Sequence, residues 1–271
     1  MYTAKALVFD KNMSKYIKWK LMLSSIPVAL LAFSLKLFLT ELVGFEGILE
    51  LSEISLIISA GVFLIGFMLA GTMADYKESE KVPGEIAASL ENIEEKVVGV
   101  CLKQALSVQN ARQEVQALAI CIFEWLIKKR KQEEVYSRLT AFNTLIHQLD
   151  MAGGAPPIVA RIWGELHHLR KMVTRTSVIS RTGFLQTGYA LLEMLLVVTF
   201  VLLVLVKFKS LVAMIMIVFF ITLIYVYMYR LIKDIDDPFE YHPETADKGA
   251  AEVALFPITE YMERLEQRLH S

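Results

Sequence analysis

The sequence predicts an all-α integral membrane protein in which four transmembrane helices flank a helical cytoplasmic insert. Two observations lead to this prediction. Hydrophobic residues make up 55% of the 271 residues, and the mean hydropathy is +0.47, whereas soluble domains contain about 45–50% apolar residues. The apolar excess is concentrated in two stretches, and the residues between them show helical periodicity without strand alternation.

Four apolar runs are long enough to cross a bilayer, which needs about 20 mostly apolar residues. They cover about residues 21–38, 54–73, 184–206 and 211–231. Lys36 lies near the outer end of the first run, where we expect its side chain to snorkel to the headgroups. The chain therefore divides into residues 1–74, with a cytoplasmic N-terminal segment and two spans, an insert at 75–182, two spans at 183–232 and a tail at 233–271.

The segments next to the spans predict the orientation. Lysines stand shortly before the first span, at positions 11, 15, 18 and 20, whereas the loop after it has no Lys or Arg. Because basic residues concentrate on the cytoplasmic side, both chain ends are expected there. Lys207 and Lys209, between the last two spans, oppose this scheme weakly. The chain is small and shows no cleavable signal pattern, so we expect a bacterial inner membrane.

The insert is predicted to consist of helices. Apolar residues recur at spacings of three and four between Ile86 and Val100, and a second stripe ends in the basic run 128–131. Further helices are expected at about 133–149 and 158–180, separated by the break Gly-Gly-Ala-Pro-Pro at 153–157. A last helix, at about 250–269, is expected to pack on the insert.

Several functions are excluded by composition and motifs. A net charge of −1 gives no basic footprint for nucleic acid. No nucleophile elbow, phosphate loop or dinucleotide fingerprint is present, so we expect no enzyme and no cofactor. Many transporters are built from inverted repeats with broken helices, and the sequence shows no such repeat.

The arrangement resembles the bestrophins and their bacterial bestrophin-like relatives. The order of spans, helical insert and spans carries the resemblance, together with a helical tail. Residues 61–67 (GVFLIGF) continue without a break into the polar residues 75–78 (DYKE), and the last span ends in residues 236–239 (DDPF). These features together cover nearly the whole chain.

The resemblance implies a homopentamer, embedded in lipid, that passively conducts small ions through an axial pore lined by the second span. The ion would be chloride or another anion, or a monovalent cation. Carried over, Phe63 and Phe67 form the pore neck, with Ser59 one turn before them, where the family usually has an apolar residue. Positions i and i+4 share a helix face, and phenylalanine rings can gate by dewetting. Alternatively, both rings face lipid or a neighbouring helix.

Acidic residues mark an outer mouth and a site inside the membrane. The outer loop carries four glutamates, at Glu41, Glu46, Glu50 and Glu53. Rings of such residues favour cations, although salt screens charges far from the neck. Glu193 lies about ten residues into the third span, where an ionisable side chain is costly and indicates function. The alternative is a hydrogen-bonded carboxyl that only positions helices.

A second acidic group follows the last span, at Asp234, Asp236, Asp237 and Glu240. Calcium prefers carboxylate oxygens, so these residues are candidate calcium ligands. In eukaryotic members of the resembled family, an acidic run after the Pro-Phe pair helps to form a calcium site, whereas here most of the acids precede Pro238. Acids that cap and solvate a helix end are the alternative.

A rival functional hypothesis is a non-conducting membrane scaffold or sensor. Its insert would bind a cytosolic partner through the basic run 128–131 and the tail helix.

Overall fold

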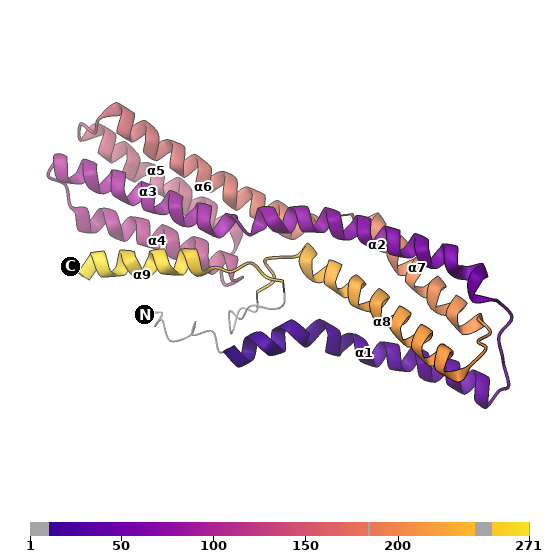
Figure 1. The fold of residues 1–271 in the computed structure, drawn as a ribbon. Helices are drawn as coiled ribbons and strands as arrows, with labels where there is room; N and C mark the ends of the chain where they lie inside the picture. The colour runs from indigo at the N-terminus through magenta and orange to yellow at the C-terminus, as the bar shows by residue number, and fades with distance from the viewer. Residues whose placement is uncertain (1–10, 184, 242–250, 271) are drawn as a thin grey trace. The chain divides into compact units, whose positions relative to one another are not determined.

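The computed structural model describes residues 11–183, 185–241 and 251–270, and this part of the chain is helical (Figure 1). The helices are α1 Lys11–Glu41, α2 Leu51–Ser79, α3 Val82–Lys103, α4 Val108–Leu126, α5 Gln132–Met151, α6 Pro156–Thr182, α7 Gln186–Leu205, α8 Leu211–Asp236 and α9 Phe256–His270. The first ten residues and the predicted helix starts at Phe184 and Ala250 lie outside the described residues.

The chain forms two compact units. The membrane unit comprises residues 1–74 and 183–236, and the insert unit comprises residues 75–182 and 237–271. The last boundary lies four residues after the position 232 that hydropathy gave, because α8 stays helical through the polar residues up to Asp236. Hydropathy detects where a span leaves the apolar layer, and a helix can continue beyond that point.

The membrane unit contains α1, α7, α8 and most of α2. Within the described residues, four helices are long and apolar enough to cross a membrane, as predicted. Helix α8 packs on α1 and on α7, and it lies between α1 and α2 (Figure 1). Large side chains join α2 to its neighbours, since Ile65 and Met68 share a buried cluster with Leu192 of α7 and Tyr225 of α8.

The insert unit is a helical bundle with its own core. Helix α3 packs on α4, α6 and α9, and α5 packs on α4 and α6. The predicted apolar stripe of α3 is fully buried at Ile86, Leu90, Ile93 and Val97. The break before α6 is also confirmed: Gly153 has a φ of +88°, in the left-handed region that favours glycine.

A buried carboxylate joins three helices of the insert unit. The side chain of Glu94 on α3 is 3% exposed and accepts hydrogen bonds from Arg112 at 3.2 Å, Arg268 at 2.6 Å and Tyr261 at 3.3 Å. Burial, followed by the charge of Glu94, raises the pKa of Tyr261. Because a buried charge is tolerated when it is paired and hydrogen-bonded, this network ties α9 to α3 and α4.

The tail helix was predicted to begin at about Ala250, whereas α9 begins at Phe256. Residues 251–255 have no helical structure, because Val253 uses its backbone to hold the residues that follow α8. Its N–H donates to the carbonyl of Pro238 at 3.0 Å, and its carbonyl accepts from the Tyr241 hydroxyl. Phe239 is buried in the core of the insert unit, so the Pro-Phe pair anchors the tail.

Candidate pore-lining surface

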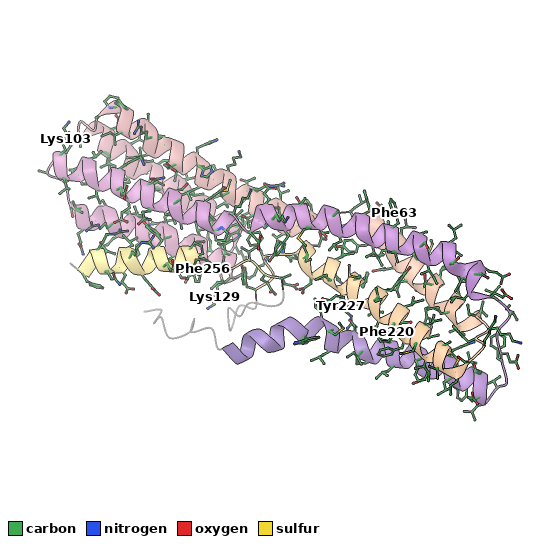
Figure 2. The ribbon with its side chains drawn as sticks, viewed as in Figure 1. Phe63, Lys103, Lys129, Phe220, Tyr227 and Phe256 are labelled. Carbon is green, nitrogen blue, oxygen red and sulfur yellow. The ribbon has the colours of Figure 1, made fainter. Side chains whose placement is uncertain are left out.

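One face of α2 is exposed in the isolated chain, and it carries all three predicted neck residues. Phe63 is 77% exposed and Phe67 is 56% exposed, and Ser59 is exposed one turn earlier. Figure 2 shows Phe63 on the side of α2 that points away from the rest of the membrane unit. The three residues therefore form one stripe that no other described part of the membrane unit covers.

The opposite face of α2 fixes how the helix is rotated. Gly61 lies against Tyr225 of α8 so closely that an added Cβ atom would be 2.5 Å from the Tyr225 hydroxyl oxygen. The same hydroxyl donates a hydrogen bond to the carbonyl of Ile58. Because Ile58 and Gly61 must face α8, Ser59, Phe63 and Phe67 must face outward.

The exposed face of α2 differs in composition from a surface built for lipid. Besides the large apolar residues Leu56, Val62, Phe63 and Phe67, it exposes serines and small residues, at Ser52, Ser55, Ser59, Ala60, Gly66 and Ala70. The exposed residues of α8 between positions 211 and 224 are all large and apolar, at Leu211, Val212, Met216, Phe220 and Ile224. Lipid tails favour large apolar side chains, whereas small and hydroxyl residues favour close helix contact or water.

Lys36 was expected to snorkel outward, and this prediction was wrong. Its side chain is 1% exposed, and its Nζ donates to the carbonyls of Val204 and Val206, both at 2.8 Å. The rings of Phe45 and Phe208 lie 5.7 and 5.8 Å from the ammonium group. The last carbonyls of a helix lack intrahelical partners and carry partial negative charge, so the ammonium group is satisfied at the end of α7 without reaching water.

The loop between α1 and α2 is pinned to the turn between α7 and α8. Backbone hydrogen bonds join Ile48 N–H to Leu205 O at 2.9 Å and Lys207 N–H to Leu49 O at 2.8 Å. Gly47 has a φ of +100°, and an added Cβ atom would be 2.6 Å from the Val206 backbone. The two connections therefore form one end of the membrane unit.

The four predicted outer-mouth glutamates lie at this end, in different environments. Lys207 Nζ is 2.5 Å from Glu46 Oε2, and this hydrogen bond and charge lower the pKa of Glu46. Glu53 Oε2 accepts from the Glu50 N–H at 2.7 Å, at the start of α2. Glu41 is exposed. Lys207, which opposed the predicted orientation, therefore has an acidic partner, and it offsets part of the expected negative field.

Glu193 lies on α7 with its side chain exposed in the isolated chain. Its Oε1 accepts a hydrogen bond from the hydroxyl of Tyr229 on α8 at 2.5 Å. This contact fits the alternative of a hydrogen-bonded carboxyl that positions helices. The partner in the structure is a neutral phenol, which had no signal in the sequence because it lies 36 positions away.

The acidic residues after the last span, Asp234, Asp236, Asp237 and Glu240, were the predicted calcium ligands. The described part of the chain contains no group of three His, Cys, Asp or Glu side chains that could hold a metal ion. Asp237 Oδ1 instead accepts from the Phe239 N–H at 3.4 Å. The turn at Asp237 fits the helix-end alternative, and calcium binding stays a prediction.

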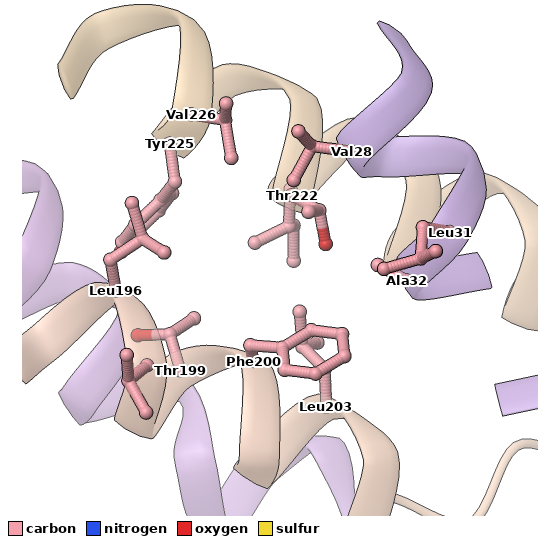
Figure 3. A pocket seen from close by; sticks show the side chains of 12 residues that line it. Val28, Leu31, Ala32, Leu196, Thr199, Phe200, Leu203, Thr222, Tyr225 and Val226 are labelled. Atoms are coloured by element: carbon pink, nitrogen blue, oxygen red, sulfur yellow. The ribbon is translucent and has the colours of Figure 1, made fainter. Parts of the chain in front are cut away.

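An apolar cavity of about 170 Å³ lies in the membrane unit, and no pattern in the sequence predicted it. It is lined by α1, α7 and α8, with Val28, Leu196, Phe200 and Tyr225 among its residues (Figure 3). An ion that entered this apolar cavity would lose its hydrating water, and the wall offers few polar groups to replace it. The α2 stripe, which includes exposed serines, is therefore the better candidate for a conduction surface.

Similarity to known proteins rests on structure. No family model matches the sequence, and no curated protein is significantly similar to it. A solved bacterial bestrophin homologue from Klebsiella pneumoniae superposes with a TM-score of 0.68 at 14% identity, covering 92% of this chain and 97% of that chain. Two single-substitution variants of that homologue give TM-scores of 0.69 and 0.70, each at 14% identity and covering 94% and 99% of the two chains. The chain therefore has the fold of the bacterial bestrophin homologues, as its resemblance to that family predicted.

Proposed function

We propose that the protein is a homopentameric ion channel that passively conducts small ions through an axial pore lined by α2. The exposed stripe of α2 is the observation that carries this proposal. It has serines at its first turns and two phenylalanines one turn apart further along. Serine oxygens can replace ion hydration, and a ring of phenylalanines can hold a narrow neck dry.

The small residues of α2 support close approach between copies of the chain. Ala60, Gly66 and Ala70 lie on the exposed side, and an added Cβ at Gly66 would meet nothing within 4 Å in the isolated chain. Small residues let helix backbones approach each other in membranes. A ring of α2 helices around a shared axis would use these positions.

Glu193 provides separate support for an assembly. It is the eighth of the 20 residues of α7, and its side chain is exposed although Tyr229 donates a hydrogen bond to it. An acidic side chain facing lipid near the middle of a span costs about 2.5–3.5 kcal/mol on insertion scales. Contact with another subunit or with water removes this cost, and a lone chain in lipid offers neither.

The direct test is conductance of the purified full-length protein in planar bilayers under a KCl gradient. We expect discrete currents, and the reversal potential distinguishes chloride from potassium conduction. Replacing Phe63 and Phe67 by Ala should enlarge the conductance and weaken gating, because the neck loses its apolar rings. Phe220→Ala removes an exposed ring from α8 and is the matched control, which should behave as the unmodified protein does.

Particle symmetry separates the channel from the scaffold hypothesis. A fivefold ring with an axial hole, together with currents that respond to the neck substitutions, supports the channel. A monomer or dimer without a hole, which conducts nothing after successful reconstitution, contradicts the proposal and favours a scaffold that binds its partner through residues 128–131 and α9.

A further inference from the structure

The insert unit contains a polar cavity of about 310 Å³, whose lining shares no residue with the α2 stripe. It lies where the end of α4, the start of α5 and the last turns of α6 meet. The polar residues that matter for its chemistry are Lys128, Lys131, Gln132, Thr176, Ser177 and Arg181. Figure 2 labels Lys129, which lies in the connection between α4 and α5.

Uncompensated positive charge surrounds the cavity. Lys128, Lys131 and Arg181 form no ion pair with any described residue. Arg130 differs, because it is paired with Glu124 and with Glu134. Glu133 is the acidic residue of the lining, so the cavity keeps a positive balance.

A buried hydroxyl on the cavity wall lacks a partner. Thr176 is 2% exposed, and its Oγ1 has no hydrogen-bond partner within the described structure. An unpaired buried hydroxyl is costly, so its position in a cavity wall indicates a partner that enters the cavity. The hydroxyl hydrogen can be donated, which suits an acceptor-rich ligand.

The neighbouring groups hold further donors in place. Gln132 Oε1 accepts from Ser177 Oγ and from Arg181 Nη2, both at 2.7 Å. This shared acceptor fixes the Arg181 guanidinium and leaves its remaining N–H groups available, since a guanidinium has five. The 20-residue helix α5 also begins here, at Gln132, and a helix N-terminus favours negative charge.

We propose that this cavity binds a phosphate oxyanion, supplied either by an anionic lipid headgroup or as free inorganic phosphate. Its cations, the Thr176 hydroxyl and the α5 N-terminus are all suited to an anion with several acceptor oxygens. Arg181 precedes the first residue of the membrane span α7 by only five positions. A lipid headgroup is therefore included as a source of the phosphate. The proposal is independent of ion conduction and stands whether or not the protein is a channel.

The test measures the thermal stability of the full-length protein in nanodiscs. One arm titrates inorganic phosphate against chloride at constant ionic strength, in discs of phosphatidylcholine. The other arm compares phosphatidylcholine discs with equimolar phosphatidylcholine and phosphatidylglycerol. We expect a rise in Tm in at least one arm, because a ligand that binds only the folded state stabilises it. A response to phosphatidylglycerol alone identifies the headgroup as the source, and a response to phosphate alone identifies the free anion.

Three variants locate the site. Arg181→Gln should weaken binding at least tenfold. Thr176→Val should weaken it several-fold, while its Tm without ligand equals or exceeds that of the unmodified protein, because an unpaired hydroxyl is removed. Arg161→Gln, an exposed position earlier on α6, is the matched control and should keep the full response.

Three results would overturn the proposal. The first is no response of the unmodified protein in either arm. The second is equal loss in Arg161→Gln and Arg181→Gln, which would indicate only general surface charge. The third is loss in Arg181→Gln without loss in Thr176→Val, which would place the anion on the surface and outside the cavity.

Discussion

The Nζ atom of Lys36 lies 2.8 Å from the carbonyl oxygen of Val206, so a charged residue of α1 is bound to the end of the third span. A second bond of the same length reaches Val204. Together with the backbone pairing of Leu49 and Lys207, these contacts join the α1–α2 connection to the α7–α8 connection. These contacts therefore hold the connection that leads into the start of α2.

Replacing Lys36 by Met should destabilise the protein, because two buried carbonyls lose a charged donor. A hydrogen bond to a charged group contributes about 1.5–3 kcal/mol, so we expect a loss of at least that size. The free energy of unfolding in detergent checks it. Lys209→Met removes an exposed lysine from the same turn and should change little. Equal stability of the two variants would show that the Lys36 contacts contribute nothing.

The glycines of α2 should respond differently to alanine. Gly61→Ala places a Cβ atom 2.5 Å from the Tyr225 hydroxyl oxygen, whereas Gly66→Ala meets no atom within 4 Å in the same chain. Overpacking of this kind costs about 1–3 kcal/mol. We therefore expect a lower Tm for Gly61→Ala and an unchanged monomer fold for Gly66→Ala. A lower Tm for Gly66→Ala than for Gly61→Ala would contradict the packing of α2 against α8.

Lys207→Gln should shift the reversal potential toward cations at low salt, because Glu46 loses its partner. The effect should shrink in 1 M salt, where the Debye length is about 3 Å. Lys103→Gln, in the insert unit, is the control. If the reversal potential does not shift at low salt, or shifts equally in the control, the Lys207–Glu46 ion pair does not affect ion selectivity.

The same variant predicts a pH dependence. Lys207 lowers the pKa of Glu46 from its ordinary value of 4.5, so the interaction is present above pH 4.5 and is lost as the pH falls through the lowered pKa. In Lys207→Gln the pKa of Glu46 returns toward 4.5. The charge difference between variant and unmodified protein should therefore fade as the pH falls through 4.5. It should return only when the pH falls further, through the lowered pKa, because Glu46 is then protonated while Lys207 keeps its charge. A difference that does not fade near pH 4.5 would contradict this assignment.

Cys121 should resist alkylation in the folded protein. Burial raises the pKa of its thiol, which keeps it protonated, and the thiolate is the reactive form. Modification by N-ethylmaleimide, followed by mass spectrometry, should be slow under native conditions and fast after unfolding in denaturant. Rapid native modification would show that the core of the insert unit opens.

The sequence predicted the parts of the fold that depend on local pattern. The spans followed from hydropathy, and the buried stripe of α3 followed from its spacing. Lys36 was misplaced because its partners are backbone carbonyls nearly 170 positions away, and backbone carbonyls leave no mark in a sequence. The start of α9 was misplaced for a similar reason, since Val253 is held by Pro238 across the chain.

The candidate site was predicted in part. Helical spacing placed Ser59, Phe63 and Phe67 on one face, and the structure adds that this face is exposed, because Gly61 and Tyr225 set the rotation of α2. The cavity beside Thr176 could not be predicted, because its walls come from three helices and its basic run looked like an ordinary helix end.

The most direct measurement of the central claim is the reactivity of single cysteines introduced on the two kinds of exposed surface. Ser59→Cys and Phe67→Cys lie on the α2 stripe, and Phe220→Cys lies on α8, with both native cysteines buried. A membrane-impermeant methanethiosulfonate reagent attacks thiolates, which form in water and not in lipid. If α2 lines an aqueous pore, the reagent modifies the α2 positions and changes the current, while Phe220→Cys stays unmodified. Protection of all three positions alike, with an unchanged current, would show that the α2 stripe faces lipid and would contradict the account.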